Sequence, residues 1–135
     1  MKPIPFHPDK DMAPVPFSAQ HVEAAQRLKR LGLPWTPHVG CFVWDPAGAI
    51  EADSPFPGKI YFILSLARFI GIFGSIEAIR DKLVWLPTWH QARLLSRRLG
   101  ISDEEIGALW NSHPAPEPGD ELLALYEKLA EVLGE

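Results

Sequence analysis

Three polar residues beside an expected helix start have types and a spacing that suit the binding of an anion. Thr88 follows Pro87, and His90 and Arg93 lie on the first turns of the helix that comes next. Free backbone amides at a helix start attract carboxylate or phosphate groups. Thr88, His90 and Arg93 are therefore a candidate site for an anionic ligand, either in a binding protein or in an enzyme. The alternative is an ordinary capped and well-packed helix start.

Arg68 is the single charge in the apolar run from Ile60 to Phe73. An arginine in such a place must reach solvent along its stem or pair with a carboxylate. A ligand-binding arginine at the floor of a pocket is the other interpretation. On that basis Arg68 joins the candidate anion site.

His38 and Cys41 have the His-x-x-Cys spacing of two metal ligands, which Asp45 or His90 would complete. The same residues raise the question of a Cys41 nucleophile with a histidine base, although such a pair needs a geometry that spacing does not show. A lone cysteine on an expected strand is usually a small buried hydrophobe. We therefore predict no metal ligand, no catalytic residue and no cofactor.

Residues 92–110, which read ARLLSRRLGISDEEIGALW, resemble the helix-turn-helix motif of bacterial DNA-binding proteins. Ser96, Gly100 and Ile106 stand where that motif has a small residue, a glycine and an aliphatic residue. The resemblance covers about 20 residues and implies a DNA-binding function for residues 89–111. The basic cluster that would touch phosphates consists of Arg93, Arg97 and Arg98.

Three carboxylates oppose this interpretation. Asp103, Glu104 and Glu105 open the helix that would read the bases, and they would repel a duplex. Acidic residues also favour a helix N-terminus in any protein. Nucleic acid is therefore a disfavoured partner, and the alternative is an ordinary helical corner with a solvated basic face.

Composition sets further bounds. The chain has 135 residues, 47% of them hydrophobic and 22% charged, and a net charge of −4. This length suits one domain, and the negative charge does not favour nucleic acid or an anionic membrane. The N-terminus has no apolar run of a secretory signal, and the longest apolar run is shorter than the roughly 20 residues of a membrane span. We expect a cytoplasmic protein.

The first half of the chain predicts strands. Two short apolar runs, 39–44 and 48–52, flank Asp45-Pro46-Ala47-Gly48, which suits a type I turn, so the sequence predicts a β-hairpin at about 39–52. A third strand is expected at about 59–64, with an earlier helix start as the competing interpretation. Val84–Leu86 is a further short strand.

The rest of the chain predicts helices, with capping patterns at Ser18, Ser75, Thr88 and Ser102. The expected helices are 19–31, 65–73, 76–82, 89–99, 103–111 and 120–133. The fold class is therefore α+β, with a small antiparallel sheet, five to six helices and a mostly helical C-terminal half. The apolar run Ile60–Phe73 should form the centre of the core.

The domain organisation and the absence of catalytic motifs together suggest a function for this chain. Residues 1–16 contain five prolines and should form an extended arm, and residues 17–135 should form a single globular domain. Phosphate loops, GxGxxG, HExxH and GxSxG are missing, which argues against an enzyme. With the arm and five tryptophans, this favours a non-catalytic protein–protein interaction or accessory protein that binds a protein partner or self-associates. DNA binding and anion binding are the alternatives.

Overall fold

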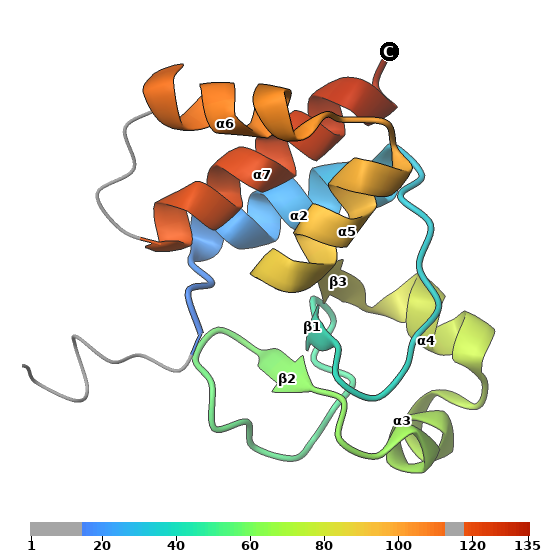
Figure 1. Cartoon of the computed structure of the whole chain (residues 1–135). Coiled ribbons are helices and arrows are strands. Elements are labelled where there is room, and N and C mark those ends of the chain that lie inside the picture. The colour runs from blue at the N-terminus through green and yellow to red at the C-terminus, as the bar shows by residue number, and fades with distance from the viewer. Residues whose placement is uncertain (1–14, 113–117) are drawn as a thin grey trace, which may run out of the picture.

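The computed structural model describes residues 15–112 and 118–135, and these residues form an α+β fold (Figure 1). Within the described residues the strands are β1 (Phe42–Trp44), β2 (Ile60–Phe62) and β3 (Val84–Leu86). The helices are α2 (Ala19–Arg30), α3 (Leu66–Phe73), α4 (Ile76–Lys82), α5 (Trp89–Arg98), α6 (Asp103–Ser112) and α7 (Pro118–Leu133). The predicted fold class, with its small antiparallel sheet and helical C-terminal half, is confirmed.

The sheet has the order β2-β1-β3, and both of its strand pairs are antiparallel. Val43, at the middle of the central strand, lies opposite Tyr61 on one side and Trp85 on the other. The strands predicted at 59–64 and at Val84–Leu86 are therefore both present. The competing prediction, an early helix start in this region, is wrong because α3 begins only at Leu66.

The predicted hairpin at 39–52 is wrong in its second strand, because residues 48–52 form a loop. The cause is Asp45, whose side chain is buried. One carboxylate oxygen accepts the N–H of Ala49 at 3.1 Å and the other accepts the N–H of Ile50 at 2.8 Å. An aspartate that satisfies the following amides competes with strand pairing. The chain consequently pairs with β1 only at Ile60.

Local capping signals place the helices correctly. Thr88 and Gln91 form the predicted capping box, with the Thr88 N–H donating to Gln91 Oε1 at 2.9 Å and the Gln91 N–H donating to Thr88 Oγ1 at 3.2 Å. Ser75 Oγ accepts from Ala78 N–H at the start of α4. Such side chains satisfy amides that have no partner within the helix. The helix bounds accordingly lie close to those predicted from the sequence.

The sheet separates two hydrophobic clusters, because successive residues of a strand point to opposite faces. The large cluster joins one face of the sheet to α2, α5, α6 and α7, through residues such as Leu28, Leu86 and Leu125. The small cluster joins the other face to α3, α4 and the segment before β1, through Val43 and Phe69. In Figure 1, α3 and α4 lie on the opposite side of the sheet from the other helices.

The prediction that the whole run Ile60–Phe73 forms the centre of the core is wrong. Ile63 and Phe69 are buried, but Leu64 is 75% exposed and Ile72 is 48% exposed. A helix as short as α3 covers its neighbours with one face only, and α3 packs mainly on α4. Fully buried side chains lie instead in both clusters, among them Leu125 of α7 and Val43 of β1.

Two further sequence predictions concern the proline-rich arm and the absence of a membrane span. Of the proline-rich arm, residues 1–14 lie outside the described part of the chain, and residues 15 and 16 adopt neither helix nor strand. Across residues 15–112 and 118–135, no helix is long and apolar enough to span a bilayer.

Candidate functional site

An apolar groove of about 370 Å³ lies where the segment before α2, strand β1 and the starts of α5 and α7 meet. We call it the aromatic groove. It is lined by Val15, Pro16, Phe17, Phe42, Thr88, Trp89, Pro118, Glu121 and Leu122. These residues come from four separate parts of the chain and are brought together by the large cluster, to which Phe17, Phe42 and Leu122 belong.

Phe42 fixes one wall of the aromatic groove through contacts with three other rings. Its ring centroid lies 5.3 Å from that of Phe17, 5.5 Å from that of Phe56 and 4.9 Å from that of Phe62. The three contacts are edge-on or tilted, as the quadrupoles of aromatic rings favour. Phe62 is 37% exposed, so the aromatic surface continues beyond the groove to solvent.

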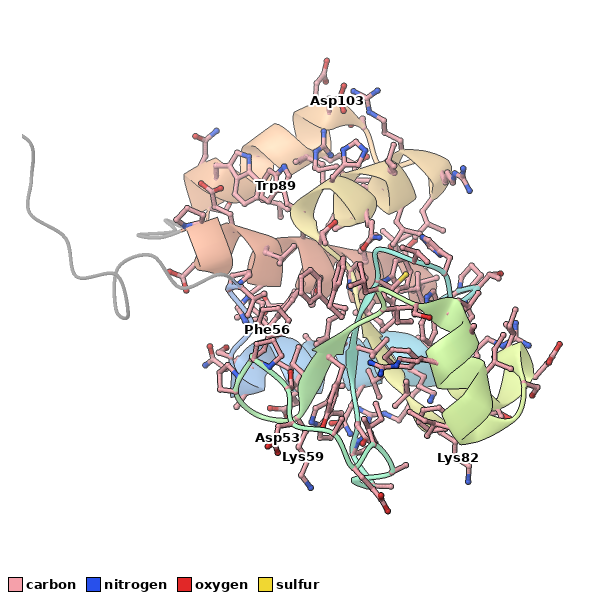
Figure 2. The ribbon with its side chains drawn as sticks, turned by 90° about the horizontal axis from the view of Figure 1, so that it is seen from below. Asp53, Phe56, Lys59, Lys82, Trp89 and Asp103 are labelled. Atoms are coloured by element: carbon pink, nitrogen blue, oxygen red, sulfur yellow. The ribbon has the colours of Figure 1, made fainter. Side chains whose placement is uncertain are left out.

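Trp89 forms another part of the groove wall. It is the first residue of α5 and is 40% exposed. Its ring stacks on Trp110 of α6, with centroids 5.7 Å apart and an interplanar angle of 24°. Figure 2 shows Trp89 and Phe56 toward the same side of the molecule. A large ring that is held by a neighbour but open to solvent loses little entropy when a ligand packs on it.

His21 joins the start of α2 to the start of α7, beside the aromatic groove. Its Nδ1 accepts the N–H of Ser18 at 3.1 Å, and its Nε2 donates to the carbonyl of Gly119 at 2.7 Å. Burial lowers the pKa of His21, although the Gly119 carbonyl and Asp120 act in the opposite direction. The ring is therefore neutral, with its hydrogen on Nε2, because that tautomer satisfies both partners.

Two further contacts join α7 to the segments before α2 and α5. Gly119 packs closely on Pro16, since a Cβ at position 119 would lie 3.2 Å from the Pro16 Cβ. The buried Tyr126 hydroxyl of α7 donates to the carbonyl of Pro87, just before α5. Burial also raises the pKa of Tyr126 well above its usual value, so this donor stays protonated. The walls of the groove are thus set by contacts that lie below its surface.

The chemistry of the aromatic groove is that of a binding surface. The N–H and hydroxyl of Thr88 are both engaged with Gln91, and the other lining residues apart from Glu121 have apolar side chains. Among the described lining residues there is no cysteine, histidine or lysine that would act as a nucleophile or base. This arrangement can bury an apolar group.

The predicted anion-site residues do not lie together in one pocket of the structure. Thr88 caps α5, and His90 is exposed on the same helix. Arg93 donates to Asp103 of α6 at 3.0 Å. Arg68 is exposed on α3, which packs on the other face of the sheet. Only Thr88 lines the aromatic groove, and anion binding by these residues stays a prediction.

The residues of the helix-turn-helix resemblance lie in α5, in α6 and in the turn between them. Ser96 is fully buried and donates to the carbonyl of Ala92, Gly100 has a φ of 77°, and Ile106 is buried. Two residues of the basic cluster, however, contact α6, because Asp103 accepts from Arg93 and, at 3.3 Å, from Arg97. Asp103 therefore offsets part of the positive charge that would meet phosphates.

His38 and Cys41 lie together, but their surroundings suit a structural role. The Cys41 sulfur is 3.5 Å from Nδ1 and 3.6 Å from Nε2 of His38, and Nδ1 also contacts the carbonyl of Thr36 at 2.8 Å. Burial raises the pKa of the Cys41 thiol, which disfavours the nucleophilic thiolate. Within residues 15–112 and 118–135 no group of three His, Cys, Asp or Glu residues is placed to hold a metal ion.

Sequence reasoning missed most of the aromatic groove. Of its lining residues, only Thr88 belongs to a site predicted from the sequence. Phe42 and Leu122 carry no local signal, because their role arises from packing between distant segments. A pattern with one period cannot identify a surface that is built from four segments.

Comparisons with protein-family models, with curated proteins and with solved structures find no match to this chain. A functional assignment therefore rests on the groove and on its physical character.

Proposed function

We propose that this protein is a non-catalytic interaction domain that binds a short apolar segment of a partner protein in the aromatic groove. The observation that carries the proposal is the position of Trp89, which is 40% exposed where it lines an apolar groove. Tryptophans beside apolar pockets are common anchors of protein interfaces, because they bury a large area at a small cost in side-chain entropy.

The size of the groove supports a segment as its occupant. Its volume of about 370 Å³ is near the lower end of the roughly 300–1,000 Å³ that is typical of ligand pockets. A few side chains of an extended or helical segment fill such a space, whereas a folded partner would need a broader surface of roughly 800 Å² on each side. The exposed ring of Phe62 extends the apolar contact beyond the groove.

A displayed library of random peptides tests this function. We expect the intact protein to enrich peptides with apolar side chains, and Trp89→Ala to weaken their binding by about 30-fold or more, the loss typical of a hot-spot residue. The matched control is Leu94→Ala, which removes another exposed apolar residue of α5 that does not line the groove. Leu94→Ala should leave the affinity unchanged.

Thermal melting of both variants shows whether each is folded at the assay temperature. Enriched peptides that bind folded Trp89→Ala and Leu94→Ala with the same affinity would contradict the proposal, and so would a library from which nothing is enriched.

A further inference from the structure

We infer that the segment bound in the aromatic groove is an extended, proline-containing stretch of the partner with a basic residue beside it. The inference rests on the proposed function and specifies the chemistry of the partner. Three features of the groove lead to it: its lack of free hydrogen-bonding groups, its aromatic walls and the charge at its edge.

The first feature is the scarcity of hydrogen-bonding groups. Thr88 uses both its N–H and its hydroxyl within the capping box, and the remaining walls are apolar except at Glu121. A peptide N–H buried against such walls would lose its hydrogen bond to water without gaining another. Proline has no N–H, so a proline-containing segment avoids this cost. The groove therefore favours segments that contain proline over segments in which every residue carries a backbone N–H.

The second feature is the aromatic surface. The rings of Phe17, Phe42 and Trp89 face a common space, and Trp110 holds Trp89 in position. Grooves lined with aromatic rings are a recurring way to bind polyproline II segments, whose rings pack flat on the aromatic side chains. A proline-rich segment is already extended before it binds, which lowers the entropic cost of association.

The third feature is the negative charge at one edge of the groove. Glu121 lines the groove in the first turn of α7. Arg93 and Arg97, the cations of neighbouring α5 that form ion pairs, contact Asp103 instead. A lysine or arginine of the partner placed beside Glu121 would complement this charge.

Synthetic peptides test the inference on the intact protein. The probe is a ten-residue peptide with four prolines, one central leucine and two lysines, and its affinity is measured by titration. The matched peptides replace the prolines by alanine or the lysines by glutamate. We expect the alanine peptide to bind about tenfold more weakly, because it is more flexible and carries unpaired amides.

The charge is tested by reversing it on the protein. Glu121→Lys should weaken binding of the probe about fivefold, which is typical of a partly exposed ion pair. Glu127→Lys makes the same change at an exposed position of α7 that does not line the groove, and it should have less than a twofold effect. Equal effects of the two substitutions would overturn the basic part of the inference.

The outcomes separate this inference from the proposed function. Equal binding of the proline and alanine peptides, with both abolished in Trp89→Ala, would overturn the inference and leave the groove as a binding site. Probe binding that folded Trp89→Ala retains would contradict both. A peptide with the sequence of residues 1–14 is tested alongside, and tighter binding of that peptide than of the probe would assign the groove to this chain's own arm instead of a partner.

Discussion

The two faces of the sheet are covered by helices of different length, and this difference decides what each face leaves exposed. On one face α2 and α7, of 12 and 16 residues, enclose the large cluster, in which Leu28 and Leu125 are fully buried. On the other face α3 and α4 have only 8 and 7 residues, and Leu64 and Ile72 stay in solvent. The short helices still bury residues such as Ile63 and Ile79 completely, but they leave Leu64 and Ile72 uncovered.

The largest expected effect compares one leucine from each face. Leu125→Ala in the large cluster should lower the free energy of unfolding by about 2–5 kcal/mol, because it removes a fully buried side chain and leaves a cavity. Leu64→Ala should change it by less than about 0.5 kcal/mol, because that side chain is mostly exposed. Urea unfolding of both variants measures the difference. Similar decreases in the free energy of unfolding from the two substitutions would contradict the difference between the two faces.

A smaller effect concerns the buried carboxylate that holds the loop over the small cluster. Asp45→Ala should lower the free energy of unfolding by about 2–3 kcal/mol, because the amides of Ala49 and Ile50 lose their acceptor. Asp53→Ala, at an exposed position of the same loop, serves as the control and should cost less than about 0.5 kcal/mol. If both variants unfold at the same urea concentration as the unchanged protein, a carboxylate anchor on this face is ruled out.

The smallest effect is a pH dependence on the large-cluster face. Because burial holds the pKa of His21 below its ordinary value of 6.5, the unfolded chain binds a proton before the folded chain does. Stability is therefore fully present above about pH 6.5 and decreases as the pH falls through the folded pKa. Asp120, the charged group that acts on His21, raises this pKa and so limits the loss.

Melting temperatures measured between pH 8 and pH 5 test this dependence. A substitution His21→Gln keeps a polar side chain but removes the titrating group, so its melting temperature should fall less on acidification than that of the unchanged protein. Parallel curves for the two proteins would show that His21 does not contribute.

Local signals accounted for most of the fold. The capping patterns at Ser75 and Thr88 placed α4 and α5 because a cap depends only on residues a few positions apart. The strand predicted at 48–52 failed because one buried side chain, Asp45, took the amides that a ladder would use. That competition depends on the burial of Asp45, which the local sequence does not encode.

The candidate site was harder to predict, because its residues belong together only in three dimensions. Thr88 was predicted from the sequence as part of a helix start suited to anions, whereas the structure puts it beside Phe42 and Leu122 in apolar surroundings. The sequence pattern indicated only the free amide donors of a helix start. The surface chemistry around that helix start is determined by the packing of four segments, and residue spacing in the sequence does not indicate how those segments pack.

One wall of the aromatic groove comes from residues 15–17 and another from residues 118–122, which are far apart in the sequence. During synthesis on a ribosome, the earlier wall emerges more than a hundred residues before the later one. A nascent chain consequently presents no finished groove until α7 has been released and has packed on α2. Under the proposed function, a partner segment is therefore bound only after α7 has folded onto α2.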